Sequence, residues 1–140
     1  MSVRETVIED MIRVLKDMDD PKPVLVTREP FDVEKLAITQ FPAILVQSGE
    51  EIREDFSMRG RTGSINYQIR CFVRGTQLDQ KKNEIIERVE EQLELDRNRG
   101  TANLSIKTEI IEIAPVVRLE PLGEVLITAR VQYKYTRGTT

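Results

Sequence analysis

Histidine, the side chain that most often acts as a general base, is absent from this 140-residue sequence, and cysteine occurs once, at Cys71. A lone cysteine cannot form an intrachain disulfide, and a structural zinc site would need histidine or further cysteine ligands. Nucleophilic catalysis also needs a positioned base. The sequence therefore predicts a protein that is not an enzyme, with no catalytic residue, no metal site and no cofactor.

Adjacent carboxylates are numerous, at 50–51, 54–55 and 90–91, but consecutive side chains point to different faces of a strand or helix. A solvated surface is therefore preferred to a glycosidase-like or metal site. The glycine-rich stretch 59–63 could contact phosphate, yet it lacks the lysine and the following helix of a phosphate loop. An exposed turn or a protein contact is the preferred interpretation of this stretch.

Composition predicts one soluble domain over residues 1–140. The chain is 39% hydrophobic and 32% charged, with a net charge of −3, which suits neither a disordered nor a membrane protein. Positive and negative residues are mixed along the chain, so non-specific binding to nucleic acid is not indicated. No apolar run is long enough for a bilayer or a secretion signal, and we expect synthesis inside a cell and no membrane partner.

Two amphipathic helices are expected from apolar residues at three- and four-residue intervals. The first spans about 3–18 and begins with a capping box formed by Ser2 and Glu5. The second is capped by Thr76 and ends at 98–100, where a glycine is available for the left-handed cap.

Alternating apolar residues predict several strands and one hairpin. The strand at 43–47 should end at Ser48-Gly49, residues 31–42 should be mostly loop, and the neighbouring Ile110 and Ile111 indicate a β-bulge within 109–111. The hairpin should bury one face of each arm, including Ile52 on the first. The expected strands are 23–27, 43–47, 104–113 and 125–135, and the hairpin is 50–75.

Cys71 shares the apolar face of the second hairpin arm with residues at every second position. A buried, unreactive thiol is expected there. The arm from Ser64 to Arg74 has eleven residues, which at about 3.3 Å per residue is on the order of 35 Å. Part of it must protrude or be covered by another chain. The predicted fold is α+β, with a mainly antiparallel sheet, both helices on one face and a long protruding hairpin.

This layout resembles the tail terminator proteins, also called minor tail or tail completion proteins, of tailed bacteriophages and related contractile particles. The resemblance covers almost the whole chain. It is carried by the amphipathic N-terminal helix and by four stretches: 41–46, the hairpin arm 66–75, the helix opening at Leu78-Asp79 and the closing strand 123–135.

The resemblance implies a structural virion protein without catalytic residues. Such a subunit forms a ring, usually a hexamer, that caps the tail tube, stops tail growth and joins the neck or head connector. The implied partners are further copies of the chain, the tail tube protein, the connector and, in a contractile tail, the sheath protein. DNA would only pass through the lumen. The implied location is the virion tail, assembled in the host cytoplasm.

The hairpin is the expected element of contact between subunits or with the tube. Arg59 and Arg61 would pair with carboxylates of a neighbour, although exposed pairs are each worth about 0.2 to 1 kcal/mol. Apolar contacts would have to contribute more, and Phe56, Met58 and Phe72 are the candidates. Arg74 completes this hypothetical interface.

Three alternatives remain open from the sequence. The chain could form another head-tail joining ring in the neck rather than the terminator itself. It could also be a small α+β module that binds nucleic acid, or one that binds a ligand.

Overall fold

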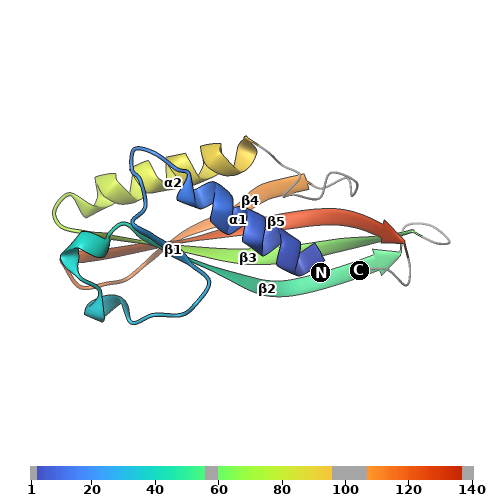
Figure 1. Ribbon diagram of the computed structural model, residues 1–140, viewed down its shortest axis with the longest axis horizontal. Coiled ribbons are helices and arrows are strands. Elements are labelled where there is room, and N and C mark those ends of the chain that lie inside the picture. The colour runs from blue at the N-terminus through green and yellow to red at the C-terminus, as the bar shows by residue number, and fades with distance from the viewer. Residues whose placement is uncertain (1–2, 56–59, 96–106, 137–140) are drawn as a thin grey trace.

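The computed structural model describes residues 3–55, 60–95 and 107–136 (Figure 1). Two helices and five strands form most of this part of the chain, together with two short 3-10 turns between β1 and β2. In chain order the elements are α1 (Val3–Lys16), β1 (Leu25–Thr27), η1 (Val33–Lys35), η2 (Ile38–Gln40), β2 (Ala43–Asp55), β3 (Gly60–Arg74), α2 (Leu78–Glu94), β4 (Lys107–Val116) and β5 (Leu122–Thr136).

The five strands form one sheet in the order β1-β2-β3-β5-β4. Only the short β1 runs parallel to its neighbour, and the other three pairings are antiparallel. The predicted α+β class and the mainly antiparallel sheet are confirmed. In the described residues no helix has the length and apolar character needed to cross a membrane.

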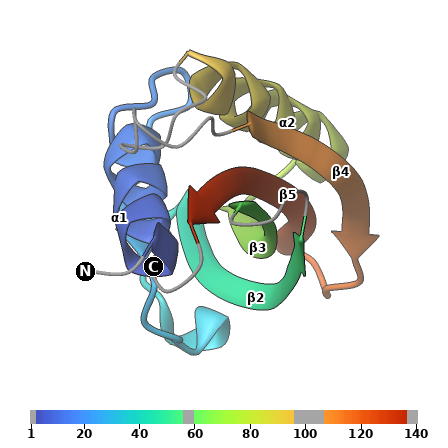
Figure 2. The same ribbon diagram turned by 90° about the vertical axis from the view of Figure 1, so that its right-hand side faces the viewer.

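The main core lies between the sheet and the two helices, and the sheet curls beneath them (Figure 2). Odd-numbered side chains of β3 and β5 point into it because successive residues of a strand face opposite sides. Full burial of one such aliphatic side chain stabilises the fold by about 1.5 to 3 kcal/mol. The helix residues of this core are Val7, Ile8, Met11 and Leu15 from α1, and Ile85, Val89 and Leu93 from α2.

A second, smaller cluster occupies the opposite face of the sheet, near β1. Phe72 and Leu45 are buried there against Val33 of the 3-10 turn η1. Phe31 packs edge-on to Phe72, with ring centroids 5.4 Å apart. The segment between β1 and β2, predicted to be mostly loop, therefore covers one end of this face with two short 3-10 turns.

The first hairpin arm differs from the prediction. β2 does not end at Ser48-Gly49 but continues to Asp55, because a β-bulge absorbs the irregularity: Gly49 and Glu50 together oppose one residue of β3. The extra residue reverses the alternation. Ile52, expected on the buried face, therefore points away from the main core and is 53% exposed.

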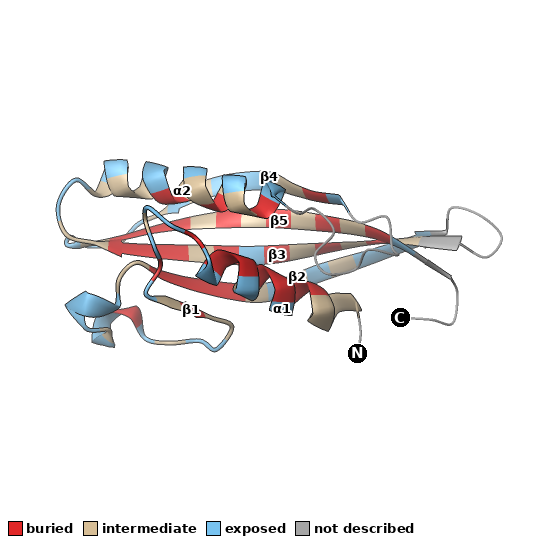
Figure 3. Ribbon diagram, turned by 45° about the horizontal axis from the view of Figure 1, so that its top comes forward, coloured by how far each residue is buried: buried red, intermediate tan, exposed pale blue. Residues whose placement is uncertain are grey.

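The second arm is covered by this chain itself. β5 pairs with β3 along its whole length, from Gly60 to Arg74, so the length of this arm needs no second chain to satisfy its backbone. Burial decreases toward the far end of β2, where exposed residues predominate (Figure 3). The arm is thus the middle strand of a three-stranded part of the sheet, between β2 and β5.

Two further local predictions have different outcomes. The bulge predicted within 109–111 is confirmed, because the register of β4 against β5 shifts between Ile110 and Glu112. The cap predicted at Thr76 is wrong. The residue that precedes α2 is Gln77, which has a left-handed backbone (φ 54°) and makes no side-chain capping hydrogen bond. Ser2 lies outside the described residues.

Candidate interaction surfaces

The residues predicted for the interface fall into three groups. Phe56, Met58 and Arg59 lie outside the described residues. Arg61 pairs through its backbone with Asp55 of β2 and Tyr135 of β5, and its side chain is also outside the described part. Phe72 and Arg74 are described, and they lie at the other end of β3.

The prediction that Phe72 contacts a neighbouring subunit needs a correction. Its side chain is buried in the second cluster, so it stabilises that face of the sheet and is not available to a neighbouring subunit. The Arg70 and Arg118 guanidiniums lie over its ring, 5.4 and 5.8 Å from the centroid. Such cation-π contacts add about 0.5 to 2 kcal/mol each.

A buried carboxylate holds both of these arginines. Glu124, whose side chain is 1% exposed, accepts hydrogen bonds from Arg70 Nε and Arg118 Nε, each at 2.8 Å. Arg118 belongs to the turn between β4 and β5, so this ion pair fastens the turn to the sheet. Its neighbours Val117 and Leu119 are left 96% and 87% exposed.

A second polar cluster joins α1 to the far half of the sheet. The bulge in β2 places Glu51 on the core side, where its Oε1 pairs with Arg4 Nη1 at 3.0 Å and its Oε2 with Arg53 Nε at 2.5 Å. Tyr133 of β5 donates its hydroxyl to the same Oε2 at 2.7 Å. The Tyr67 hydroxyl donates to the Arg4 carbonyl at 3.2 Å.

Gly63 makes the contact between Tyr133 and Glu51 possible. The two residues are on β5 and β2, with β3 between them, and the Tyr133 ring lies directly over Gly63. A Cβ atom at position 63 would lie 2.3 Å from Tyr133 Cζ. Sequence alternation alone did not reveal this cluster, although a glycine within a strand can indicate a close approach.

The surroundings of Glu51 shift its pKa, and this shift makes the stability of the protein sensitive to acid. Burial, the largest single effect, raises the pKa of Glu51, but the hydrogen bonds from Tyr133, Arg53 and Arg4 and the charge of Arg53 together hold that pKa below its usual value of 4.5. A lowered folded-state pKa gives stability that is present above the unfolded pKa and is lost as the pH falls through the folded one.

We therefore expect the free energy of unfolding to fall as the pH drops below about 4.5, with a smaller fall in Glu51→Gln. Urea unfolding at several pH values between about 7 and 3 measures both slopes. Glu54→Gln, an exposed change on the same strand, is the control and should keep the parent slope. Equal slopes for Glu51→Gln and the parent protein would contradict this role.

Cys71 is fully buried between β2 and β5, as expected for an unreactive thiol. Burial raises the pKa of the Cys71 thiol to about 12, and the charge of Glu124 acts in the same direction. The thiolate, which is the nucleophile and the metal ligand, is therefore strongly disfavoured.

Two edges of the sheet have no strand beside them in the described part of the chain. One is β4 along its length, and the other is β2 beyond Leu45, where its pairing with β1 ends. Both edges carry exposed aliphatic side chains: Ile111 and Ile113 on β4, and Ile52 on β2. Unpaired strand edges can pair with another chain.

Comparison with known proteins adds no family: no family model matches the chain, and no curated protein matches it. Within the described residues, no group of three or more histidine, cysteine, aspartate or glutamate side chains could hold a metal ion. The surfaces considered below are the sheet edges, the β4–β5 turn and the end of β3.

Proposed function

We propose that the protein is a structural subunit that assembles side by side into a ring, and that this ring is the terminator of a phage-type tail. The observation that carries the proposal is the presence of two unpaired sheet edges, β4 and the far half of β2, in the described residues. The resemblance in element order to tail terminator proteins is the reason for proposing that this ring is a tail terminator.

The two edges lie on opposite sides of the sheet and differ in sequence. A contact between unlike surfaces of identical subunits is head-to-tail, and it closes into a ring when the rotation between subunits allows it. Burying exposed aliphatic side chains at such a contact would contribute about 25 cal/mol per Å² of apolar area. The exposed isoleucines of the two edges, Ile52, Ile111 and Ile113, are suited to that role.

The hairpin over 50–75 is proposed to extend the subunit toward its neighbour. In Figure 1 the far ends of β2, β3 and β5 reach beyond the start of α1. We propose that this extension protrudes from the ring wall and contacts the next subunit or the tube, with Arg59 and Arg61 setting the register through ion pairs. We also propose that both helices cover the same face of the sheet, so that the edges of β2 and β4 are free for contact.

Tail growth would stop because the two faces of the ring differ in shape. One face of the ring would match the growing end of the tube, and the other would lack the surface that recruits the next tube subunit. That second face would instead receive the connector. No catalytic step is needed for this function.

The edge contact is tested by Ile111→Asp combined with Ile113→Asp, which places charge on β4 without touching the main core. We expect ring formation, in solution or on tail tubes, to weaken at least tenfold, because burying each isoleucine at the interface would contribute about 1.5 kcal/mol or more. Glu112→Gln, between the two positions, is the matched control. Multi-angle light scattering and negative-stain imaging measure ring formation.

If the folded double variant formed rings as the parent protein does, β4 would not be part of the interface. A monodisperse monomer that neither caps tubes nor binds connectors would reject the proposal as a whole. Binding to isolated connectors but not to tube ends would identify a neck ring, the neighbouring function in the same particle.

A further inference from the structure

A cavity of about 560 Å³ lies at the end of the sheet where β3 ends. It is bounded by the end of β3, the first turns of α2, the 3-10 turn η2 and the turn that precedes β5. Its size falls within the range of about 300 to 1,000 Å³ that is usual for ligand sites. The lining is mostly apolar and includes Ile38, Phe41, Pro42, Val73 and Pro121.

Arg74, at the wall of this cavity, is exceptional among the arginines of the described residues. Each of the other arginines whose side chain is described lies within ion-pair distance of a carboxylate. The Arg74 guanidinium instead lies over the Phe41 ring, 6.0 Å from its centroid. A guanidinium is the group best suited to bind a carboxylate through two parallel hydrogen bonds.

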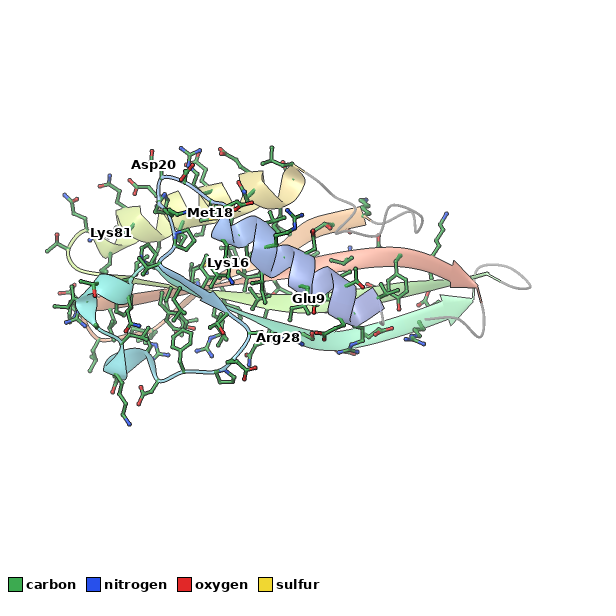
Figure 4. The ribbon with its side chains drawn as sticks, in the orientation of Figure 1. Glu9, Lys16, Met18, Asp20, Arg28 and Lys81 are labelled. Carbon is green, nitrogen blue, oxygen red and sulfur yellow. The ribbon has the colours of Figure 1, made fainter. Side chains whose placement is uncertain are left out.

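Two more polar groups line the same cavity. The Lys81 ammonium donates to the Arg74 carbonyl at 3.0 Å. Figure 4 labels Lys81 near the start of α2. An ammonium has three donors, so donors remain for a ligand. Glu84, one turn further along α2, accepts from Gln80 Nε2 at 3.2 Å and retains acceptor capacity toward an N–H group.

We propose that this cavity binds a short protein segment in which acidic residues adjoin large apolar ones. The apolar lining receives an aromatic or aliphatic side chain. Arg74 and Lys81 bind the carboxylate of the neighbouring residue, and Glu84 accepts from a backbone N–H. A free fatty acid offers the carboxylate and the apolar body but no N–H donor, so the combination of cations and a carboxylate favours a peptide.

Residues 54–58 of this chain, Glu-Asp-Phe-Ser-Met, have the required composition and define a convenient probe. The experiment titrates the full-length protein with this peptide, acetylated, amidated and fluorescently labelled, and follows polarisation. We expect saturable binding, weakened at least fivefold by Arg74→Gln. Arg130→Gln is the matched control, because Arg130 lies in β5, away from the cavity, and it should bind as the parent does. Lys81→Met provides an independent second variant.

Three results would overturn the role of the cations, the peptide as the ligand, or the site itself. A peptide with Gln and Asn in place of Glu54 and Asp55 should bind more weakly, and equal binding would overturn the role of the cations. Saturable binding of octanoate without binding of the peptide would overturn the peptide as the ligand. The absence of saturation up to millimolar peptide would overturn the site. None of these results depends on ring formation, so the site and the ring can fail separately.

Discussion

Replacing Glu124 by alanine is expected to lower the free energy of unfolding by about 3 kcal/mol, because a buried charge that loses its partner is costly. Both Arg70 and Arg118 would lose their carboxylate while lying against Phe72. These arginines are partly exposed, so water can solvate them in part. The effect should therefore be near the lower end of the range for broken buried ion pairs. Urea unfolding followed by circular dichroism measures it.

Glu112→Ala is the matched control, since Glu112 is exposed on the adjacent strand β4. It should change the free energy of unfolding by less than about 0.5 kcal/mol. Glu124→Gln keeps the size of the side chain and one acceptor oxygen for the two arginines, so it should be intermediate. If Glu124→Ala were no more destabilising than Glu112→Ala, the β4–β5 turn would not be held by this ion pair.

Gly63→Ala is expected to destabilise the protein by about 2 to 3 kcal/mol, because one added methyl group overpacks a filled site. The new Cβ would lie 2.3 Å from Tyr133 Cζ and 2.6 Å from its hydroxyl oxygen. The ring must then move, and its hydrogen bond to Glu51 is broken as it does so. The adjacent Ser64→Ala, on the other face of β3, is the control and should have a small effect.

A double-mutant cycle isolates the clash. In a Tyr133→Leu background the added methyl group meets a smaller side chain, so Gly63→Ala should cost less there by about 1 kcal/mol or more. Additive effects would mean that the cost arises from the backbone of β3 and not from Tyr133. The same measurements report on the link between α1 and the sheet, because Arg4 pairs with Glu51.

The α+β class could be predicted because it depends on local periodicity. Apolar residues recur at every second position from Ile65 to Val73 and from Val125 to Tyr133, and both predicted strands are present with these residues buried. Apolar stripes likewise predicted both helices. The errors lie at Ser48-Gly49 and Thr76, where a polar or glycine residue was interpreted as an end or a cap. A bulge and the left-handed Gln77 occupy those places instead.

The candidate sites were less predictable. Arg74 was predicted as a contact residue from the sequence, but its cavity depends on Phe41 and Pro121, which are distant in the chain. Phe72 was expected to be a contact residue, but the segment between β1 and β2 covers it. A cross-strand neighbour or a covering loop cannot be inferred from the spacing of residues along one strand.

The sequence by itself determined the fold class, the burial of Cys71 and the two apolar helix faces, because each depends on residues a few positions apart. Only the tertiary structure decided that Glu51 faces the core and that Glu124 binds two arginines. Arg4 and Glu51 are 47 positions apart, and Arg70 and Glu124 are 54 apart. Such contacts depend on strand order and on one extra residue in β2, which reverses the side to which every later residue of that strand points.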